Sequence, residues 1–377
     1  MQVSCIPVVI CNGSYNDLGC IRSLGEKGVQ SIYITDGEHI IPIKKSKYLL
    51  STYITDIESN VAECIKDISM HYEKKLVIIP TSDIAAAEID SHYQELSRHA
   101  ICPNCQGKTE YYMNKSIQAT VALQVGFSVP NFAVYQLQSD SVPFNDIKFP
   151  CIIKPLLSIK GSKSHITKCF TIEELKHAIG HYTECEEYQV MIQDLADTKG
   201  QQEICITGVS LPSREIIIGG WIEKYRMIGN GSTTFGKFHH DMKPCYAEKV
   251  KQLIREMGFT GIFDIECFLS THNELIFIEC NLRNGAYGYA TSRAGINLPW
   301  IYFANSAGMP CQKDEARDLV FMEERSDFLH VRNKDVTMAQ WIKDVLRTDV
   351  FLTFNKHDIS PIIRVPQIIK NHLYIRK

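Results

Sequence analysis

The stretch "FDIECFLSTHNELIFIECNLR", residues 263–283, decides how the chain is interpreted, because polar side chains recur at every second position of two apolar runs. Apolar runs rich in Ile and Phe around a polar "STHN" predict a β-hairpin with a two-residue turn at His272 and Asn273. That turn places Glu266 directly opposite Glu279. Strand alternation then predicts a polar face of Asp264, Glu266, Phe277, Glu279, Asn281 and Arg283, and a core face of Ile265, Cys267, Ile276, Ile278 and Cys280.

Two glutamates that face each other need a positive neighbour, because opposed β-carbons lie only about 4.5 to 5.5 Å apart. Two carboxylates and the amide oxygen of Asn281 form an oxygen set that suits magnesium, which also keeps phosphate ligands. Arg283, further along the same face, would hold a phosphoryl or carboxylate oxygen. Two alternatives are a protonated acid pair and a salt bridge between Glu279 and Arg283 on a solvated face.

Cationic partners for a magnesium-bound phosphate precede the hairpin. Lys154 lies at the end of the apolar strand "PCIIKP", and the loop "SIKGSKSH", residues 158–165, supplies flexible amides and further lysines. Lys115 opens a helix, where an anion is favoured. A rival motif, "GSTTFGKF" at 231–238, has P-loop spacing, but Phe238 stands where Ser or Thr is needed and no helix is predicted to follow.

Length and charge bound the class of protein. With 377 residues, 45% of them hydrophobic, the chain is predicted to form two or three globular domains. A net charge of −3 with no basic block argues against a nucleic-acid partner. Neither a signal peptide nor a membrane span is recognised, so we expect a cytoplasmic protein.

The 14 cysteines are scattered through apolar strands, so we expect mostly reduced core thiols. Cys102 and Cys105, in "CPNC", are half of a zinc-binding pattern. No second CxxC or HxxxH supplies the remaining ligands, so zinc is the weaker interpretation.

The first hundred residues predict a doubly wound parallel lobe, because "IPVVICNGSYNDLGCIRSLGEKGVQSIYITD" and "KLVIIPTSDIAAAEIDSHYQEL" both follow a strand–helix pattern. Later strands with short links predict antiparallel pairing. The candidate substrate contacts are the turn "NGSYN", Arg22 with Ser23, Ser82 with Asp83, and the loop from Arg226 to His240; each is equally open to a structural role.

In this order, these residues resemble the ATP-grasp superfamily, whose closing signature of acid, any residue, Asn, any residue, Arg reads "ECNLR" here. The chain is similar in particular to carboxylate-amine ligases such as D-aspartate ligases, through "NLRNG" and the later "GINL". The resemblance implies an α/β and α+β fold in which an N-terminal doubly wound lobe (1–110) precedes a two-subdomain ATP-grasp fold. Its expected parts are a lid (111–196), a central subdomain with the metal site (197–310) and a C-terminal subdomain (311–377).

The resemblance also implies roles for particular residues. Lys115 and Lys154 would bind the nucleotide phosphates, with Lys160, Gly161 and Ser162 in the covering loop. Gln193, Asp194 and Leu195 would hold adenine, and Glu203 the ribose. Glu266, Glu279 and Asn281 would bind two magnesium ions, which Mn²⁺ can replace, and Arg283 would act with Lys154 in catalysis.

The implied activity is that of an ADP-forming ligase joining a small carboxylate, such as an amino acid, to an amine through an acyl phosphate. Catalysis would consist mainly of positioning and charge neutralisation. Two alternatives stay open: an ATP-grasp enzyme that phosphorylates or carboxylates a metabolite, and a nucleotide-binding module without turnover. Small-molecule substrates are the expected partners, and the resemblance leaves a homodimer open.

Overall fold

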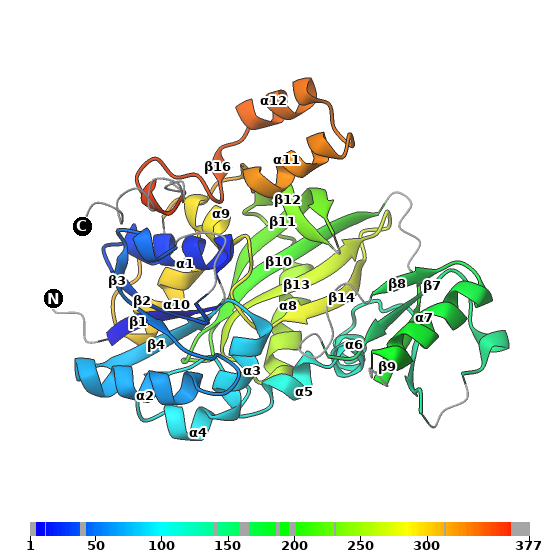
Figure 1. The fold of residues 1–377 in the computed structure, drawn as a ribbon, viewed down its shortest axis with the longest axis horizontal. Coiled ribbons are helices and arrows are strands. Elements are labelled where there is room, and N and C mark those ends of the chain that lie inside the picture. The colour runs from blue at the N-terminus through cyan, green and yellow to red at the C-terminus, as the bar shows by residue number, and fades with distance from the viewer. Residues whose placement is uncertain are drawn as a thin grey trace, which may run out of the picture.

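A computed structural model describes residues 5–11, 13–37, 43–138, 142–157, 166–185, 189–195, 201–229, 231–312 and 314–362. Three sheets organise these residues: a five-stranded, a four-stranded and a seven-stranded sheet. The five-stranded and four-stranded sheets lie at opposite ends of the molecule, with the seven-stranded sheet between them (Figure 1). This α/β and α+β organisation confirms the fold class predicted from the sequence.

The N-terminal sheet is parallel throughout, in the order β3-β2-β1-β4-β5. Its strands are β1 (Cys5–Ile10), β2 (Ser31–Thr35), β3 (Leu49–Ile54), β4 (Lys75–Pro80) and β5 (Ala100–Ile101). The helices of this region are α1 (Tyr15–Gly25), α2 (Val61–Tyr72), α3 (Asp83–Ser91) and α4 (Tyr93–Leu96), with a 3-10 turn at η1 (Ile43–Lys45). Every residue of β1 is buried, as expected for a strand covered on both faces.

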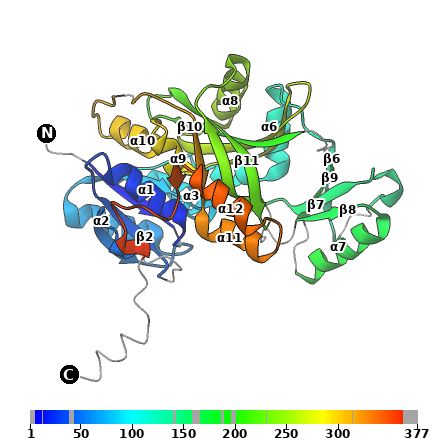
Figure 2. The same ribbon diagram turned by 90° about the horizontal axis from the view of Figure 1, so that it is seen from above.

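The four-stranded sheet forms a separate small layer, in the order β6-β9-β7-β8, with antiparallel pairing throughout. Its strands are β6 (Phe132–Gln136), β7 (Cys151–Pro155), β8 (Thr167–Cys169) and β9 (Gln189–Asp194). Helix α7 (Ile172–Glu184) packs on this sheet through Leu175, Ala178 and Tyr182, and η2 (Phe144–Asp146) lies in a connection. This lobe lies at the far end of the molecule from the N-terminal sheet (Figure 2).

The seven-stranded sheet has the order β14-β13-β10-β11-β12-β15-β16 and is antiparallel except for its last pair. Its strands are β10 (Gln202–Ser210), β11 (Ile216–Ile228), β12 (Ser232–His239), β13 (Gly261–Leu269), β14 (Leu275–Asn281), β15 (Leu319–Met322) and β16 (Val350–Phe351). The predicted antiparallel pairing of β10 with β11 is therefore confirmed. Since residues 232–239 are a strand of this sheet, the rival P-loop interpretation is wrong.

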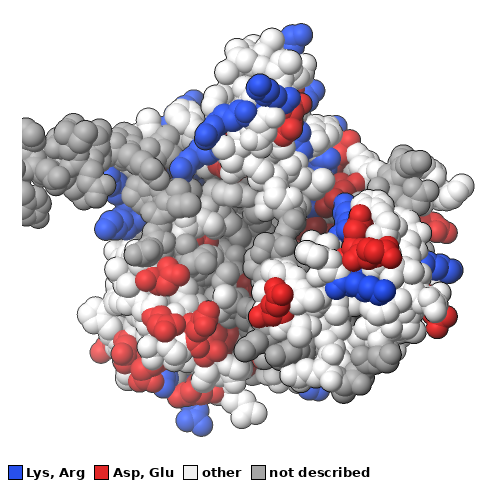
Figure 3. Space-filling model, turned by 45° about the vertical axis from the view of Figure 1, so that its right-hand side comes forward, with Lys and Arg blue, Asp and Glu red and all other residues white. Residues whose placement is uncertain are grey.

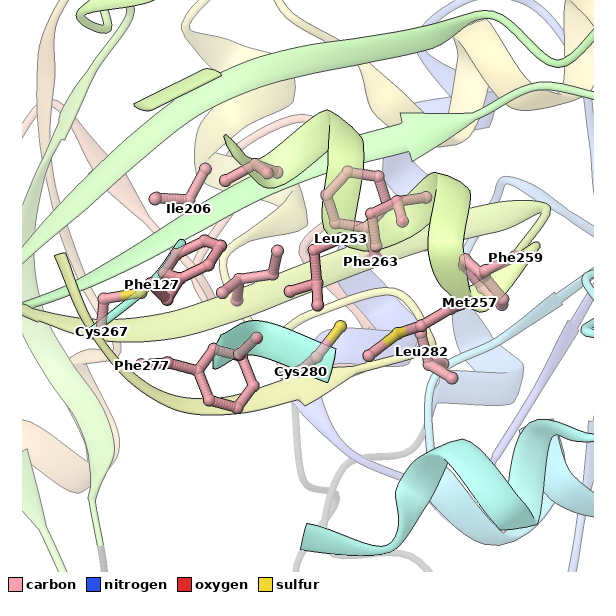
Figure 4. Packing of buried hydrophobic residues seen from close by; sticks show 14 of the residues in the cluster. Phe127, Ile206, Leu253, Met257, Phe259, Phe263, Cys267, Phe277, Cys280 and Leu282 are labelled. Carbon is pink, nitrogen blue, oxygen red and sulfur yellow. The ribbon is translucent and has the colours of Figure 1, made fainter. Parts of the chain in front are cut away.

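One face of the central sheet carries the largest buried cluster (Figure 4). The helices that contribute to this cluster are α5 (Thr109–Met113), α6 (Lys115–Gln124) and α8 (Pro244–Met257), together with α3 through Ala86. Helix α8 begins with Pro244 and ends at Gly258, which has a φ of 63°. That left-handed conformation suits glycine at the end of a helix. The covered face leaves the opposite face of the sheet for the polar residues of the hairpin.

The remaining elements close the fold. They are α9 (Gly288–Arg293), α10 (Leu298–Ser306), α11 (Glu324–Arg332), α12 (Met338–Leu346) and η4 (Ser360–Ile362). Helix α10 packs between the central and N-terminal sheets through Leu298, Tyr302 and Phe303. Helices α11 and α12 project from the body of the molecule (Figure 1). None of the helices within the described ranges is long and apolar enough to cross a membrane.

Candidate active site

The predicted pairing of Glu266 with Glu279, and of Asp264 with Asn281, is confirmed by the register of β13 and β14. The turn that produces it was predicted wrongly. Ser270 N–H donates to Glu274 O at 2.9 Å and Asn273 has a φ of 60°, so the turn is one residue longer than predicted. A bulge between Glu266 and Cys267 then shifts the register by one residue and restores the predicted pair.

The same bulge makes part of the predicted face pattern wrong. Phe277 pairs with Cys267 and is buried in the core rather than on the acidic face (Figure 4). Ile276 and Ile278, predicted to lie in the core, are only half-buried. An extra residue in a strand reverses the alternation on one side of the bulge. Ile265 and Cys280 lie in the core, as predicted.

The positive group beside Glu266 is Lys224, which sequence analysis missed. Its ammonium donates to Glu266 Oε2 at 2.8 Å and to Glu203 Oε1 at 2.5 Å, and its side chain is 0% exposed. Burial alone would lower the pKa of Lys224, but Tyr287, Glu266 and Glu203 raise it above its ordinary value. Lys224 lies in a strand that pairs with β10. The sequence does not reveal which strands become neighbours, so the contact of Lys224 with Glu266 could not be predicted.

Arg283 lies just beyond the end of β14, and its side chain is 15% exposed. Its Nε is 3.3 Å from Asp83 Oδ1, and its Nη1 is 3.8 Å from Asp264 Oδ2. Burial would lower the pKa of Arg283, but Asp83, Asp264, Glu279 and Glu266 raise it. Arg283 thus forms ion pairs with two aspartates, and the charge of Glu279, its partner in the alternative considered from the sequence, also acts on it.

Asp264 was predicted to lie on the polar face of the hairpin, but no role in the site was assigned to it from the sequence. Burial raises its pKa to about 6, although Arg283 acts in the opposite direction. A Cβ atom on Gly285 would lie 1.4 Å from Asp264 Oδ2, so only glycine allows this close approach of the chain after β14. The glycine in "NLRNG" thus shapes the wall next to Arg283.

Lys154 and Lys115 meet at the edge of the same site. Lys154 Nζ donates to Gln193 Oε1 at 2.9 Å. Burial lowers the pKa of Lys154 to about 8; Glu279 raises it and Lys115 lowers it further. The backbone N–H of Lys115 donates to Leu156 O at 2.9 Å, which ties the start of α6 to the end of β7. A small pocket lies between the start of α6 and the end of β14, lined by Asp83, Met113, Lys115, Gln118, Glu279, Cys280 and Asn281.

The predicted adenine segment is held within the protein. Asp194 N–H donates to Asn131 O at 2.8 Å, and Leu195 N–H donates to Pro150 O at 3.0 Å. The Gln193 side chain bridges Lys154 and Pro130 O. Lys160, Gly161 and Ser162, predicted to cover the phosphates, lie outside the described residues.

Two of the candidate substrate contacts are structural. Arg22 is fully buried and binds Asp358 and the Thr353 carbonyl, so it joins α1 to the C-terminal region. Ser82 caps α3 by accepting from Ala85 N–H at 3.3 Å. Its neighbour Asp83, by contrast, reaches Arg283 and the small pocket.

The described residues 13–16 of the turn "NGSYN" are organised around the buried carboxylate of Asp17. That carboxylate accepts hydrogen bonds from the backbone N–H groups of Gly13 and Ser14 at 2.9 and 3.0 Å, and from Thr81 Oγ1 at 2.5 Å. The amides of Asn16 and Asn284 also bind each other, at 2.7 Å. These contacts fasten the carboxyl ends of β1 and β4 to the chain after Arg283.

Within the described ranges, no three His, Cys, Asp or Glu side chains form a cluster able to hold a metal ion. Cys102 and Cys105 are both buried, and burial raises the pKa of each thiol to about 12. The candidate magnesium ligands of the β13–β14 hairpin differ from such a cluster, because they are two glutamates and one asparagine. Its all-oxygen chemistry fits Mg²⁺, with Glu266 shared with Lys224.

No family model and no curated protein matches this chain. Solved structures do match. The biotin carboxylase domain of the 2-oxoglutarate carboxylase of Hydrogenobacter thermophilus, solved as a dimer with MgADP and bicarbonate, is 16% identical with a TM-score of 0.65; the match covers 83% of this chain and 73% of that chain. N5-carboxyaminoimidazole synthetase of Staphylococcus aureus in complex with ADP is 13% identical with a TM-score of 0.67. That match covers 89% of this chain and 87% of that chain. The L-amino acid ligase of Bacillus licheniformis is 13% identical with a TM-score of 0.60, and the match covers 80% of this chain and 74% of that chain.

These similarities establish a fold rather than a substrate, because the sequence identities are low. The chain has the ATP-grasp fold found in carboxylate-amine ligases and related carboxylases, as the resemblance of its motifs implies.

Proposed function

We propose that this protein is an ATP-dependent carboxylate-amine ligase that forms an amide or peptide bond and releases ADP and phosphate. The observation that carries the proposal is the pairing of Glu266 with Glu279, beside Asn281, on a face that also gathers Arg283 and Lys154. Oxygen ligands for magnesium next to buried cations are what phosphoryl transfer requires. The fold shared with an L-amino acid ligase supports this choice.

In the proposed reaction, a carboxylate oxygen of the first substrate attacks the γ-phosphorus of ATP, and the bond from that phosphorus to the bridging oxygen of ADP breaks. The amine nitrogen of the second substrate then attacks the acyl carbon. Phosphate leaves and the nitrogen loses a proton. Lys154 and Lys115 would hold phosphate oxygens, and Arg283 would hold the oxygens of the acyl phosphate.

Glu266, Glu279 and Asn281 are the residues that would hold magnesium. A bound magnesium ion would neutralise negative charge on the phosphates. Lys224 would keep Glu266 in place through its hydrogen bond. Gln193, Asp194 and Leu195 remain our proposed adenine contacts, and Glu203, which binds Lys224, the proposed ribose contact.

Lys154 is suited to an anionic ligand by its environment. Its ammonium is buried, and burial lowers its pKa to about 8. An anionic phosphate beside it would favour the charged form, because an opposite charge in a poorly solvated site raises the pKa of a lysine. Nucleotide binding would therefore reduce the free-energy cost of keeping the buried Lys154 ammonium charged.

The test is phosphate release from ATP and magnesium in the presence of pooled amino acids, other small carboxylates and amines, with mass spectrometry of the products. An adduct equal to acid plus amine minus water, formed with ADP, supports the proposal. The matched control is Glu279→Gln, which removes one proposed magnesium ligand. ADP formation without an adduct in any pool would contradict ligase activity.

A second candidate is carboxylation, in which bicarbonate is the activated carboxylate. It is favoured by the fold shared with a biotin carboxylase domain and with N5-carboxyaminoimidazole synthetase. The same pools, with and without bicarbonate, separate the two reactions. A product that forms only when bicarbonate is present, and that contains the carbon atom of bicarbonate, would show that the reaction is carboxylation instead of ligation.

A further inference from the structure

Helices α11 and α12, residues 324–346, form a hairpin anchored to the central sheet by a buried charge cluster. Arg226 on β11 binds Asp327 through Nε at 3.0 Å and Nη2 at 2.7 Å, and Asp344 through Nη1 at 2.5 Å. The two aspartate side chains are 0% and 1% exposed. Two-point contact of a guanidinium group with Asp327 fixes the orientation of α11, so the hairpin is presented rigidly.

Helix α12 turns its apolar side away from the protein. Met338, Ile342 and Leu346 are 47%, 48% and 81% exposed. A spacing of four residues places them in one stripe along the helix. The buried residue of α12 is instead Asp344. Trp341 faces inward, because its Nε1–H donates to Asp327 Oδ2 at 3.1 Å.

The exposed charged residues of the hairpin are mostly basic. From 324 to 347 the exposed charged residues are Arg325, Arg332, Lys334, Lys343 and Arg347, opposed by a single exposed acid, Asp335. Of these, Arg347 also forms an ion pair with Asp344 at 3.0 Å, so four basic side chains lie outside the anchor. Asp327 and Asp344 are directed into the anchor, and Glu324 accepts hydrogen bonds from the backbone N–H groups of Thr353 and Phe354. Figure 3 accordingly shows more blue than red on the lobe at the top of the view.

We infer that the α11–α12 hairpin is a docking surface for an acidic protein partner that packs an apolar helical stripe against Met338, Ile342 and Leu346. Complementary charge around an apolar centre is the usual arrangement of a specific interface. Since the stripe is short, the interface belongs to the small, transient class. Arg226, which anchors the hairpin, and Lys224, which binds Glu266, both belong to β11, so the docking surface is joined to the candidate active site through one strand.

Other occupants fit the surface less well. The C-terminal residues 363–377 of this chain contain no Asp or Glu, so they do not complement a basic surface. A second copy of the hairpin would bring like charges together. A lipid surface is disfavoured, because membrane-bound amphipathic helices insert a broad apolar face with aromatic residues, whereas Trp341 is engaged with Asp327.

The test uses the full-length protein and two fluorescein-labelled helical peptides, each with Leu at every fourth position. One peptide has Glu and the other Lys along both sides of the stripe. We expect the Glu peptide to bind in fluorescence anisotropy and to bind at least five-fold more weakly in about 0.5 M salt. Ile342→Asp is expected to weaken binding about ten-fold and Lys343→Glu about three-fold. Phe170 is an apolar residue that is 61% exposed and lies in the predicted lid. Phe170→Asp is therefore the control and should leave peptide binding unchanged.

Several outcomes would overturn the inference. They are absence of Glu-peptide binding, equal binding of both peptides, or an equal loss with Phe170→Asp. Ile342-dependent binding to phosphatidylserine vesicles in the absence of peptide would assign the surface to lipid. Dimerisation in light scattering that Ile342→Asp abolishes would assign it to a second copy. All of these measurements are independent of ligase turnover.

Discussion

Lys224 donates a hydrogen bond of 2.8 Å to Glu266, the residue that faces Glu279 across the β13–β14 hairpin. A fixed cation thus already lies beside the pair that is proposed to bind magnesium. The same ammonium binds Glu203 from the neighbouring strand. Glu266 would have to serve both the lysine and the metal, and the consequences can be measured.

Substituting Glu279 by Gln is expected to lower turnover at least about 100-fold, because one charged magnesium ligand is lost. Phosphate release and calorimetric titration with magnesium and ADP would measure the effect. Glu274→Gln, at the exposed turn of the same hairpin, is the matched control and should retain normal rates. Equal rates for wild type and Glu279→Gln would show that the glutamate pair is only structural.

Substituting Lys224 by Met should destabilise the protein by about 2 to 3 kcal/mol, because Glu203 and Glu266 lose their shared partner. The value is below that for a fully buried pair, since the two carboxylates are 21% and 16% exposed. Urea unfolding would measure it. Added magnesium should stabilise the Lys224→Met protein more than the wild type, because the cation replaces the ammonium. An identical magnesium response in both proteins would argue against a metal at Glu266.

Lys154 should make stability depend on pH above neutrality. Its pKa is about 8 in the folded protein and 10.5 in an unperturbed lysine. Between these values the unfolded chain binds more protons, so stability rises with pH. Relative to Lys154→Met, the wild type should gain about 2 kcal/mol between pH ~7 and ~9.5. Urea unfolding at both pH values tests this, with exposed Lys168→Met as the control. Parallel pH profiles for wild type and Lys154→Met would contradict it.

Gly285→Ala should disturb the wall beside Arg283. The added methyl group would lie 1.4 Å from Asp264 Oδ2, so either the chain or the carboxylate must move. We expect a loss of about 1 to 3 kcal/mol, measured by urea unfolding, as for other overpacked sites. Gly180→Ala, in α7 with open space around it, is the control and should be neutral or stabilising. An unchanged stability for Gly285→Ala would mean that Asp264 can reorient without cost.

The parallel N-terminal lobe could be predicted because each strand and its helix are adjacent in the sequence and have distinct hydrophobic periods. The pairing of Glu266 with Glu279 could be predicted for a similar reason, since a short turn brings the two strands together. The turn length and the bulge could not. Each shifts the register by one residue and their effects cancel, so the pair was right while Phe277 was placed on the wrong face.

The C-terminal strands illustrate a different limit. Residues 311–377 were predicted to form a separate C-terminal subdomain, yet β15 pairs with β12 and extends the central sheet. Nothing local in the four residues of β15 specifies that partner, which lies about 80 positions earlier. The division into four domains therefore remains a prediction.

The amino-acid sequence alone determined the hairpin, its pair of glutamates and the succession of Asn281 and Arg283, because strand alternation and a nearby turn are local properties. Tertiary structure decided which charges meet them. Lys224 reaches Glu266 from a strand two places along the sheet, and Asp83 reaches Arg283 from the N-terminal lobe. Such contacts depend on long-range packing, which brings together side chains that no local pattern connects.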